Sequence, residues 1–436
     1  MALNVEKKLN KYVKLVILVC ALILAFVAGT TFWGLRHYKE KVVSSPYLTE
    51  VQMLSDYLPN LRGTWADTPI FIYDSGVEGG SVLLSGNVHP YEPATSLACY
   101  IAMENITVEK GKVFIIPETN RSGSTLGQAG NAYPPYFHVE TEWGTKQYRI
   151  GDRTTNPLDQ WPDPFTYVHY PSMQNLSYQD IRNMNRTYPG RADGTLTERA
   201  SYAVMECIRQ NEIDISIDIH EASIMYPVVS TYVTHQKAED YALFASMILT
   251  DMSFDMKCEV SPTGLRGLSH REWGDFSDTY AVLMETPEPF IDRVPGPMTE
   301  ALFTEGCDEF LQAAADRNLV YPTSYSWNEE ARDRNLENDP RALVGFPLWY
   351  RVGRHLSGAM QVVTEVGFAN PDKEVIAYWP SYEELEEYDC GYFLHDDSEE
   401  NAPTGTYKMT EAAREFFYDG YYHRGSKDFN SLRFEI

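Results

Sequence analysis

Short apolar runs alternate with helical patterns through the first part of this chain, and few architectures accommodate that order. Residues 69–73, 81–84 and 113–117 have the composition of buried strands, and residues 93–103 between the last two have a helical pattern. This alternation predicts an α/β fold, with a mixed central sheet flanked by helices. In open sheets of this class, ligands bind at the carboxyl ends of the strands.

The stretch 86–92 follows the second of these strands and carries two groups that can bind a metal. His89 and Glu92 are three residues apart on a predicted strand-to-helix turn, so both side chains can face one point. An imidazole nitrogen and a carboxylate oxygen suit Zn²⁺, but a catalytic zinc needs a third protein ligand and an open position for water. A lone His-x-x-Glu pair also occurs by chance on ordinary surfaces.

A third ligand is offered by His220, which ends the alternating apolar and polar run 213–219. This alternation predicts a strand. Asp218 precedes His220 by two residues and so lies on the same strand face, where it could hydrogen-bond a metal-bound imidazole. The sequence therefore predicts a metal site made of His89, Glu92 and His220.

Two further motifs bear on chemistry. Asn185 and Arg186 precede Pro189, and their ordinary use would be in a turn. Residues 280–284 form an apolar run that predicts a strand ending at Glu285. A carboxylate at the end of a buried strand needs a reason.

That reason can be structural or functional. Glu285 could pair with Arg266 or Arg271, or it could be the group that takes part in catalysis. A rival exists in residues 361–366, which also predict a strand, with Glu365 near its end.

The order of these motifs resembles that of the zinc carboxypeptidase superfamily, which holds peptide carboxypeptidases and the succinylglutamate desuccinylase/aspartoacylase deacylases. In that family a His-x-x-Glu motif is followed by Asn-Arg, a strand-end His and a catalytic Glu. The resemblance covers about residues 65–295 and implies that Glu285 is the general base and that Asn185 and Arg186 bind a substrate carboxylate. Glu285 lies 65 positions after His220, and this separation resembles that of the deacylase branch more than that of the classical digestive carboxypeptidases.

The family also places an arginine before the Asn-Arg pair, where it stabilises the oxyanion of the reaction. Four arginines compete for that role here, and a surface position is the alternative for each: Arg121, Arg149, Arg153 and Arg182. Two of them lie within residues 122–180, a stretch rich in Pro, Tyr, Asn, Asp and Gly. We expect this stretch to be an insertion with short strands that walls the active site.

The resemblance implies an enzyme that binds one Zn²⁺ per chain. Zinc would lower the pKa of a water toward neutrality, Glu285 would act as general base, and Arg271 could join Asn185 and Arg186 in holding the substrate. This chemistry fits hydrolysis of an amide next to a carboxylate, as in a deacylase of N-acyl amino acids. A peptide-cleaving metallocarboxypeptidase is the alternative, and a non-catalytic peptide- or glycan-binding module is a third possibility from another class.

The N-terminal region predicts a membrane anchor. Residues 15–35 are uncharged and long enough to span a bilayer as a helix. Four lysines precede them and favour an inside N-terminus: Lys7, Lys8, Lys11 and Lys14. A cleaved signal peptide is the alternative, because Ala28 and Gly29 are small residues near a possible cleavage point. Either way, the enzyme would lie outside the cytoplasm.

The domain organisation follows from these features. We expect a membrane anchor at residues 1–40, a catalytic domain at 41–320 and a C-terminal extension at 321–436, which could complete the sheet or form a second small domain. The formal charge of −26 argues against a nucleic-acid partner, which would require a basic face. The expected partners are a small molecule or peptide with a carboxylate, and the membrane.

Overall fold

The computed structural model describes residues 2–127, 133–252, 256–291, 294, 296–317, 319–320, 345–419 and 430–436, with side chains from residue 10 onward. The chain forms two compact units, Met1–Lys39 and Glu40–Ile436.

The first unit is the helix α1 (Ala2–His37). Its segment Asn10–His37 is long and apolar enough to cross a membrane, and none of its most apolar part is buried. Thr30 and Thr31 donate their hydroxyls to backbone carbonyls one turn earlier, so both polar groups are satisfied within the helix. The predicted apolar helix is thus present, although a signal sequence meets the same criteria of length and composition.

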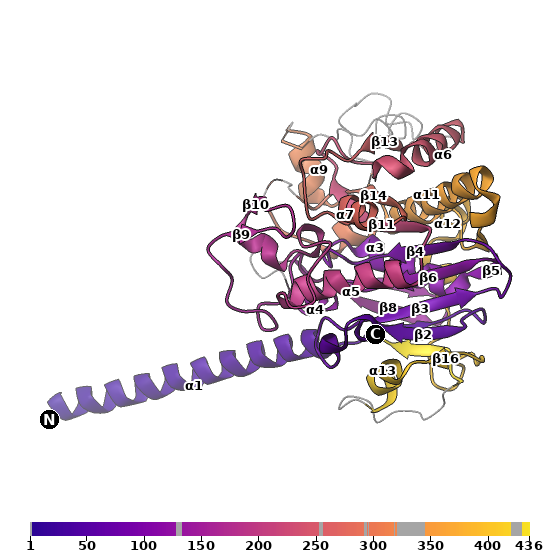
Figure 1. Ribbon diagram of the computed structural model, residues 1–436. Helices are drawn as coiled ribbons and strands as arrows, with labels where there is room; N and C mark the ends of the chain where they lie inside the picture. Colours follow the sequence, from indigo (N-terminus) through magenta and orange to yellow (C-terminus); the bar gives the residue numbers. More distant parts are fainter. Residues whose placement is uncertain are drawn as a thin grey trace. The chain divides into compact units, whose positions relative to one another are not determined.

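The second unit is built on a mixed sheet, as predicted. Nine strands of the described residues form it, in the order β13-β12-β14-β11-β4-β6-β3-β2-β16 (Figure 1). Their bounds, in the same order, are Lys257–Val260, Thr231–Thr234, Tyr280–Glu288, Ile215–Ser223, Ser81–Ser85, Lys112–Ile116, Pro69–Asp74, Glu50–Met53 and Lys408–Met409. The four central strands β14, β11, β4 and β6 run parallel, and antiparallel strands flank them.

Helices cover both faces of this sheet. On one face lie α3 (Pro93–Asn105), α6 (Glu239–Asp251) and α11 (Leu348–Ala369). On the other face lie α2 (Leu54–Tyr57), α5 (Leu196–Gln210) and α7 (Ser269–Phe276). Helix α5 crosses in front of the sheet in Figure 1. Adjacent strand residues therefore enter different cores, and Leu83 and Leu84 of β4 are buried on opposite faces.

Helix α5 begins as its sequence predicts. The Thr195 hydroxyl accepts the Glu198 N–H, and the Glu198 carboxylate accepts the Thr195 N–H. This reciprocal capping satisfies two amide groups that the first turn of a helix leaves without partners.

The predicted insertion contains short strands. They form two hairpins, β7 (Tyr136–Thr141) with β8 (Gly144–Arg149), and β9 (Tyr167–Val168) with β10 (Asn175–Leu176). Two further strand pairs are β1 (Lys41–Val43) with β17 (Arg433–Glu435) and β5 (Thr107–Lys110) with β15 (Ile376–Tyr378). The other described α-helices are short: α4 (Arg121–Ser124), α8 (Glu300–Thr304), α9 (Glu309–Ala315), α12 (Tyr382–Tyr388) and α13 (Glu411–Arg414).

The strand predicted at residues 361–366 is wrong. These residues lie within α11, whose 22 residues bury a stripe that runs from Leu348 to Val366. A six-residue window rich in valine favours a strand by propensity, but the longer periodic stripe packs against α3 and α6 and overrides it. Glu365 therefore lies on a helix, where its carboxylate accepts a hydrogen bond of 2.7 Å from Gln361.

The described C-terminal residues join the main unit. Strand β16 is the edge strand of the central sheet, parallel to β2, and α11 packs against β11 and β14. The boundary predicted between residues 320 and 321 stays a prediction, because residues 321–344 lie outside the described part of the chain.

Candidate functional site

The turn between β4 and α3 is shaped by two residues. A side chain at Gly86 would meet the carbonyl oxygen of Thr95 at 2.7 Å, so the close approach of turn and helix requires glycine. Asn87 has a positive φ of 59°, a conformation that asparagine tolerates, and its N–H donates to the Thr95 hydroxyl. These contacts fix the turn that presents His89 and Glu92.

The three predicted metal ligands come together. His89 Nδ1 lies 2.9 Å from Glu92 Oε1, and His220 Nδ1 lies 3.0 Å from Glu92 Oε2. All three side chains are buried, and one donor atom from each lies within 4.8 Å of the other two. A turn and a strand that are more than a hundred residues apart in the sequence thus supply one donor cluster.

A second set of side chains orients the two imidazoles. His220 Nε2 lies 2.9 Å from Asp218 Oδ2, as predicted, and His89 Nε2 lies 2.9 Å from Asn183 Oδ1. When each Nε2–H donates to its oxygen, the Nδ1 lone pair is free for a metal. Asn183 was not predicted, because nothing in its sequence context distinguishes it from the turn residues around it.

The cluster can accommodate a cation, but His220 would have to give up a proton to bind it. Burial alone would lower the pKa of His220, whereas the Asp218 and Glu92 carboxylates outweigh burial and raise this pKa well above its usual value. Burial lowers the pKa of the His89 imidazole to about 4, which favours the neutral form that binds metals. Burial alone would raise the pKa of Glu92, but the two neighbouring imidazoles outweigh it and hold this pKa at about 2. Two imidazoles and an ionised carboxylate form a donor set typical of a catalytic zinc, so the residues present fit this metal.

Glu285 lies next to this cluster by strand pairing. In the parallel pair β11 and β14, Glu285 is the direct partner of His220, so both side chains project from the same face. Glu285 is half-buried as a residue, but its Oε2 atom is buried, and no hydrogen bond from a described residue reaches it. Removal from water raises the pKa of Glu285 to about 8, and the negative charge of Glu92 acts in the same direction.

Both strands are longer than predicted. β11 continues past His220 to Ser223, and β14 continues past Glu285 to Glu288. The two strands stay paired as far as Ser223 and Glu288, so the site lies within a continuous ladder. The backbone pairing of the sheet therefore holds His220 and Glu285 side by side, and neither position depends on the conformation of a loop.

The structural role considered for Glu285 finds no support in the described residues. Arg266 pairs instead with Glu272 at 2.7 Å and with Asp275 at 2.8 Å. The Arg271 guanidinium is buried, donates to the Ser261 carbonyl and lies 3.8 Å from Asp275. These contacts explain how Arg271 is held in the fold, and its contact with a substrate stays a prediction.

Asn185 of the Asn-Arg pair contacts α7, and the charge of Glu285 acts on Arg186. Asn185 Oδ1 accepts the Ser269 N–H at 2.9 Å, which fixes the amide at the start of α7. Arg186 is half-buried, and burial and the nearby positive charge of Arg153 lower its pKa, whereas the charge of Glu285 raises it. The charges of Arg153, Arg186 and Glu285 thus act on one another.

The structure separates the four candidate arginines. Three of them are held elsewhere: Arg121 over the rings of Trp65 and Phe416, Arg149 by Glu40 and Glu118, and Arg182 by Asp163. Burial alone would lower the pKa of Arg153, but electrostatic interactions with Tyr91, Glu92 and Glu285 are among those that raise it. Arg153 is therefore the candidate whose charge acts on the metal cluster and on Glu285.

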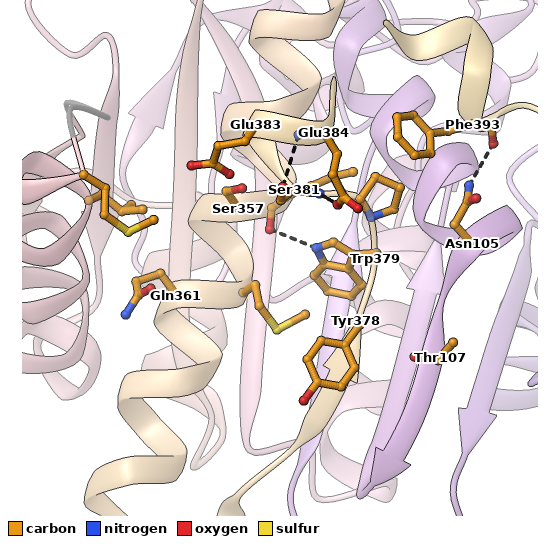
Figure 2. A pocket seen from close by; sticks show the side chains of 15 residues that line it. Asn105, Thr107, Ser357, Gln361, Tyr378, Trp379, Ser381, Glu383, Glu384 and Phe393 are labelled. Carbon is orange, nitrogen blue, oxygen red and sulfur yellow. Dashed lines mark hydrogen bonds between the residues drawn. The ribbon is translucent and has the colours of Figure 1, made fainter. Parts of the chain in front are cut away.

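A separate cavity of about 550 Å³ lies beside α11 and α12 (Figure 2). Trp379 and Phe393 are among its lining residues, and the Trp379 indole donates to the Leu356 carbonyl at 2.9 Å. None of the predicted site residues lines it, so this cavity is distinct from the candidate metal site.

Comparison with known proteins gives matches only among solved structures. No protein-family model and no curated protein matches the chain. The chain is similar to the ectoine utilization protein EutE (DoeB) from Ruegeria pomeroyi, at 18% identity and a TM-score of 0.32 over 50% of this chain and 53% of that one. It is also similar to a succinylglutamate desuccinylase/aspartoacylase from Rhodobacter sphaeroides, at 16% identity and a TM-score of 0.32 over 57% and 58% of the two chains.

A metallo-carboxypeptidase from Pseudomonas aeruginosa, in complex with (2-guanidinoethylmercapto)succinic acid, matches at 12% identity and a TM-score of 0.40 over 71% of this chain and 63% of that one. Both groups named by the motif resemblance are thus among the similar structures. The match spans only about half of the length of the ectoine utilization protein.

Proposed function

We propose that this chain is a zinc-dependent hydrolase that cleaves an amide bond next to a carboxylate, as in the deacylation of N-acyl amino acids. The observation that carries this proposal is the convergence of His89, Glu92 and His220 beside the half-buried Glu285. When bound by these three side chains, zinc would lower the pKa of a water and polarise a carbonyl.

The chain's own residues supply the remaining chemistry. Glu285 takes up the proton released from the attacking water and passes it to the leaving nitrogen. Burial raises the pKa of Glu285 to about 8, and a cation held by the three donors would lower it toward the ionised form that a base requires. Arg153 stabilises the negative charge that develops on the carbonyl oxygen.

Arg186 and Asn185 provide the carboxylate clamp. A guanidinium fork can hold a carboxylate by two parallel hydrogen bonds, and the electrostatic effect of Glu285 on Arg186 supports a clamp within reach of the general base. The carboxylate can belong to an N-acyl amino acid or to the end of a peptide. A screen of N-acyl amino acids against peptides with free and amidated C-termini, with and without a chelator, tests the proposal. Absence of chelator-sensitive hydrolysis on every substrate would contradict it.

Arg186→Ala is expected to raise KM by about 10–100-fold, because charged hydrogen bonds of this kind contribute about 1.5–3 kcal/mol each. Steady-state kinetics on the best substrate of the screen measures the change. Arg191→Ala is the control, since Arg191 is half-exposed and pairs with Glu198 at 3.3 Å. An unchanged KM in Arg186→Ala would exclude the clamp.

We further propose that α1 anchors the protein in a membrane and that the catalytic unit lies outside the cytoplasm. The full-length protein is then expected to sediment with membranes and to resist a high-salt wash, because its attachment is apolar. Immunoblotting of the fractions, together with N-terminal sequencing, provides the measurement. A soluble mature form that begins near residue 29 would show that the segment is a cleaved signal.

A further inference from the structure

A fully buried arginine lies on α11, outside the predicted site. Arg351 has no exposed surface, and its Nη1 lies 2.6 Å from Oε1 of the equally buried Glu221. Its Nε donates to the Phe346 carbonyl at 2.9 Å, and its Nη2 donates to the Phe303 carbonyl. The guanidinium is thus held on three sides and cannot swing away from Glu221.

Glu221 connects the two segments that carry the metal ligands. It follows His220 on β11, and its backbone N–H donates to Glu92 Oε2 at 3.1 Å. Its side chain projects to the opposite face of the sheet, where Oε2 accepts the N–H of Ala94 at 2.9 Å. Ala94 lies in the first turn of α3, two residues after Glu92. Glu221 therefore holds the turn of Glu92 against the strand of His220 by two hydrogen bonds.

We propose that Arg351 is a positioning residue of the metal centre, which acts through Glu221 from the opposite face of the sheet. This inference rests on the proposed function and assigns α11 a role in it. Arg351 is itself fixed by backbone carbonyls, and it holds Oε1 of the buried Glu221 so that Oε2 stays aimed at the Ala94 N–H. Without Arg351, the Glu221 side chain would lose this partner and could rotate or take up a proton, so the Ala94 N–H would lose a fixed acceptor. The spacing of Glu92 and His220 would then loosen.

The test measures zinc affinity by competition with a chromophoric chelator, with folding checked by circular dichroism. Arg351→Met is expected to weaken zinc binding by about 10–100-fold, the usual effect of removing a group that supports metal ligands. The double variant Glu221→Gln with Arg351→Met is expected to recover to within about 3-fold of the wild-type affinity, because a neutral pair replaces a buried ion pair without leaving a charge. Its glutamine oxygen can still accept the Ala94 N–H.

Lys373→Met is the matched control. Lys373 pairs with Asp214 at 2.9 Å, just before the start of the same strand β11, so its removal also deletes an ion pair but at the far end from the metal ligands. Zinc affinity is expected to stay at the wild-type value in this variant.

The outcomes separate the inference from the proposed function. If a folded Arg351→Met variant binds zinc with wild-type affinity, the positioning role is wrong. The proposed metal site would still be supported in that case, because the wild-type protein binds zinc. Equal weakening in Arg351→Met and in the double variant would also overturn it, because packing and not charge would then be the cause. If Arg351→Met fails to fold, Glu221→Gln and Glu221→Ala are compared in the Arg351→Met background. Both pairs are uncharged, and only glutamine can accept the Ala94 N–H, so equal zinc affinities would contradict the inference.

Discussion

Glu285→Gln is expected to lower turnover by about 10²–10⁴-fold while zinc stays bound, since this is the usual contribution of a general base. The substitution keeps the size of the side chain and removes its basic oxygen. Glu285 is not among the three donors that converge, and it is the strand partner of His220, so the metal cluster should keep its geometry. Steady-state kinetics and zinc analysis of the same preparation measure the two effects.

Two controls sharpen this experiment. Glu365→Gln changes the rival carboxylate, which lies on α11 and bonds to Gln361, and near-normal turnover is expected. The KM of Glu285→Gln should also change little, because Arg186 is untouched. A dead Glu365→Gln variant beside an active Glu285→Gln variant would show that the order of motifs is misleading in the C-terminal half of the site.

His220→Ala is expected to lose most of its zinc and to remain folded. It removes one of three ligands, and two protein ligands do not hold a catalytic zinc. The fold survives because β11 keeps its pairing with β4 and β14, and its apolar residues Ile217 and Ile219 stay in the core. Zinc per chain after dialysis, with the thermal unfolding midpoint, provides the measurement.

His235→Ala is the matched control for this loss. His235 is buried and bonds to Asp275 at 2.9 Å, as His220 bonds to Asp218, but it does not belong to the donor cluster. Zinc content is expected to stay near one per chain in this variant. Full retention of zinc in His220→Ala would exclude the metal assignment.

Local patterns in the sequence predicted the sheet and the donor cluster well, for identifiable reasons. Apolar alternation around Asp218 and His220 and the capping residue Thr195 act within a few positions of the chain, so they can be recognised without a structure. The convergence of His89, Glu92 and His220 followed once each was placed at the carboxyl end of a parallel strand. The strand wrongly predicted at residues 361–366 shows the limit, because a short apolar window does not distinguish a strand from a buried helix.

Other features depend on contacts that no local pattern contains. Asn183 supports His89 across 94 positions of the chain, and Arg351 reaches Glu221 across 130. The choice among four arginines likewise needed the positions of their partners, since Arg149 is distinguished from Arg153 only by the buried Glu40 and Glu118. Such contacts arise from the packing of distant segments, and a single sequence does not show which residues of two distant segments will face each other.

The pairing of His220 with Glu285 has a consequence for redesign. Neighbouring strands lie about 4.8 Å apart, so the backbone itself sets the spacing between a metal ligand and the proton acceptor. A slip of one residue would turn either side chain to the opposite face, and no loop could compensate. Arg153, in contrast, comes from the insertion at 122–180, and Arg186 follows it closely. Laboratory evolution toward new substrates should therefore accumulate changes in these loops, including insertions and deletions, while β11 and β14 accept almost none.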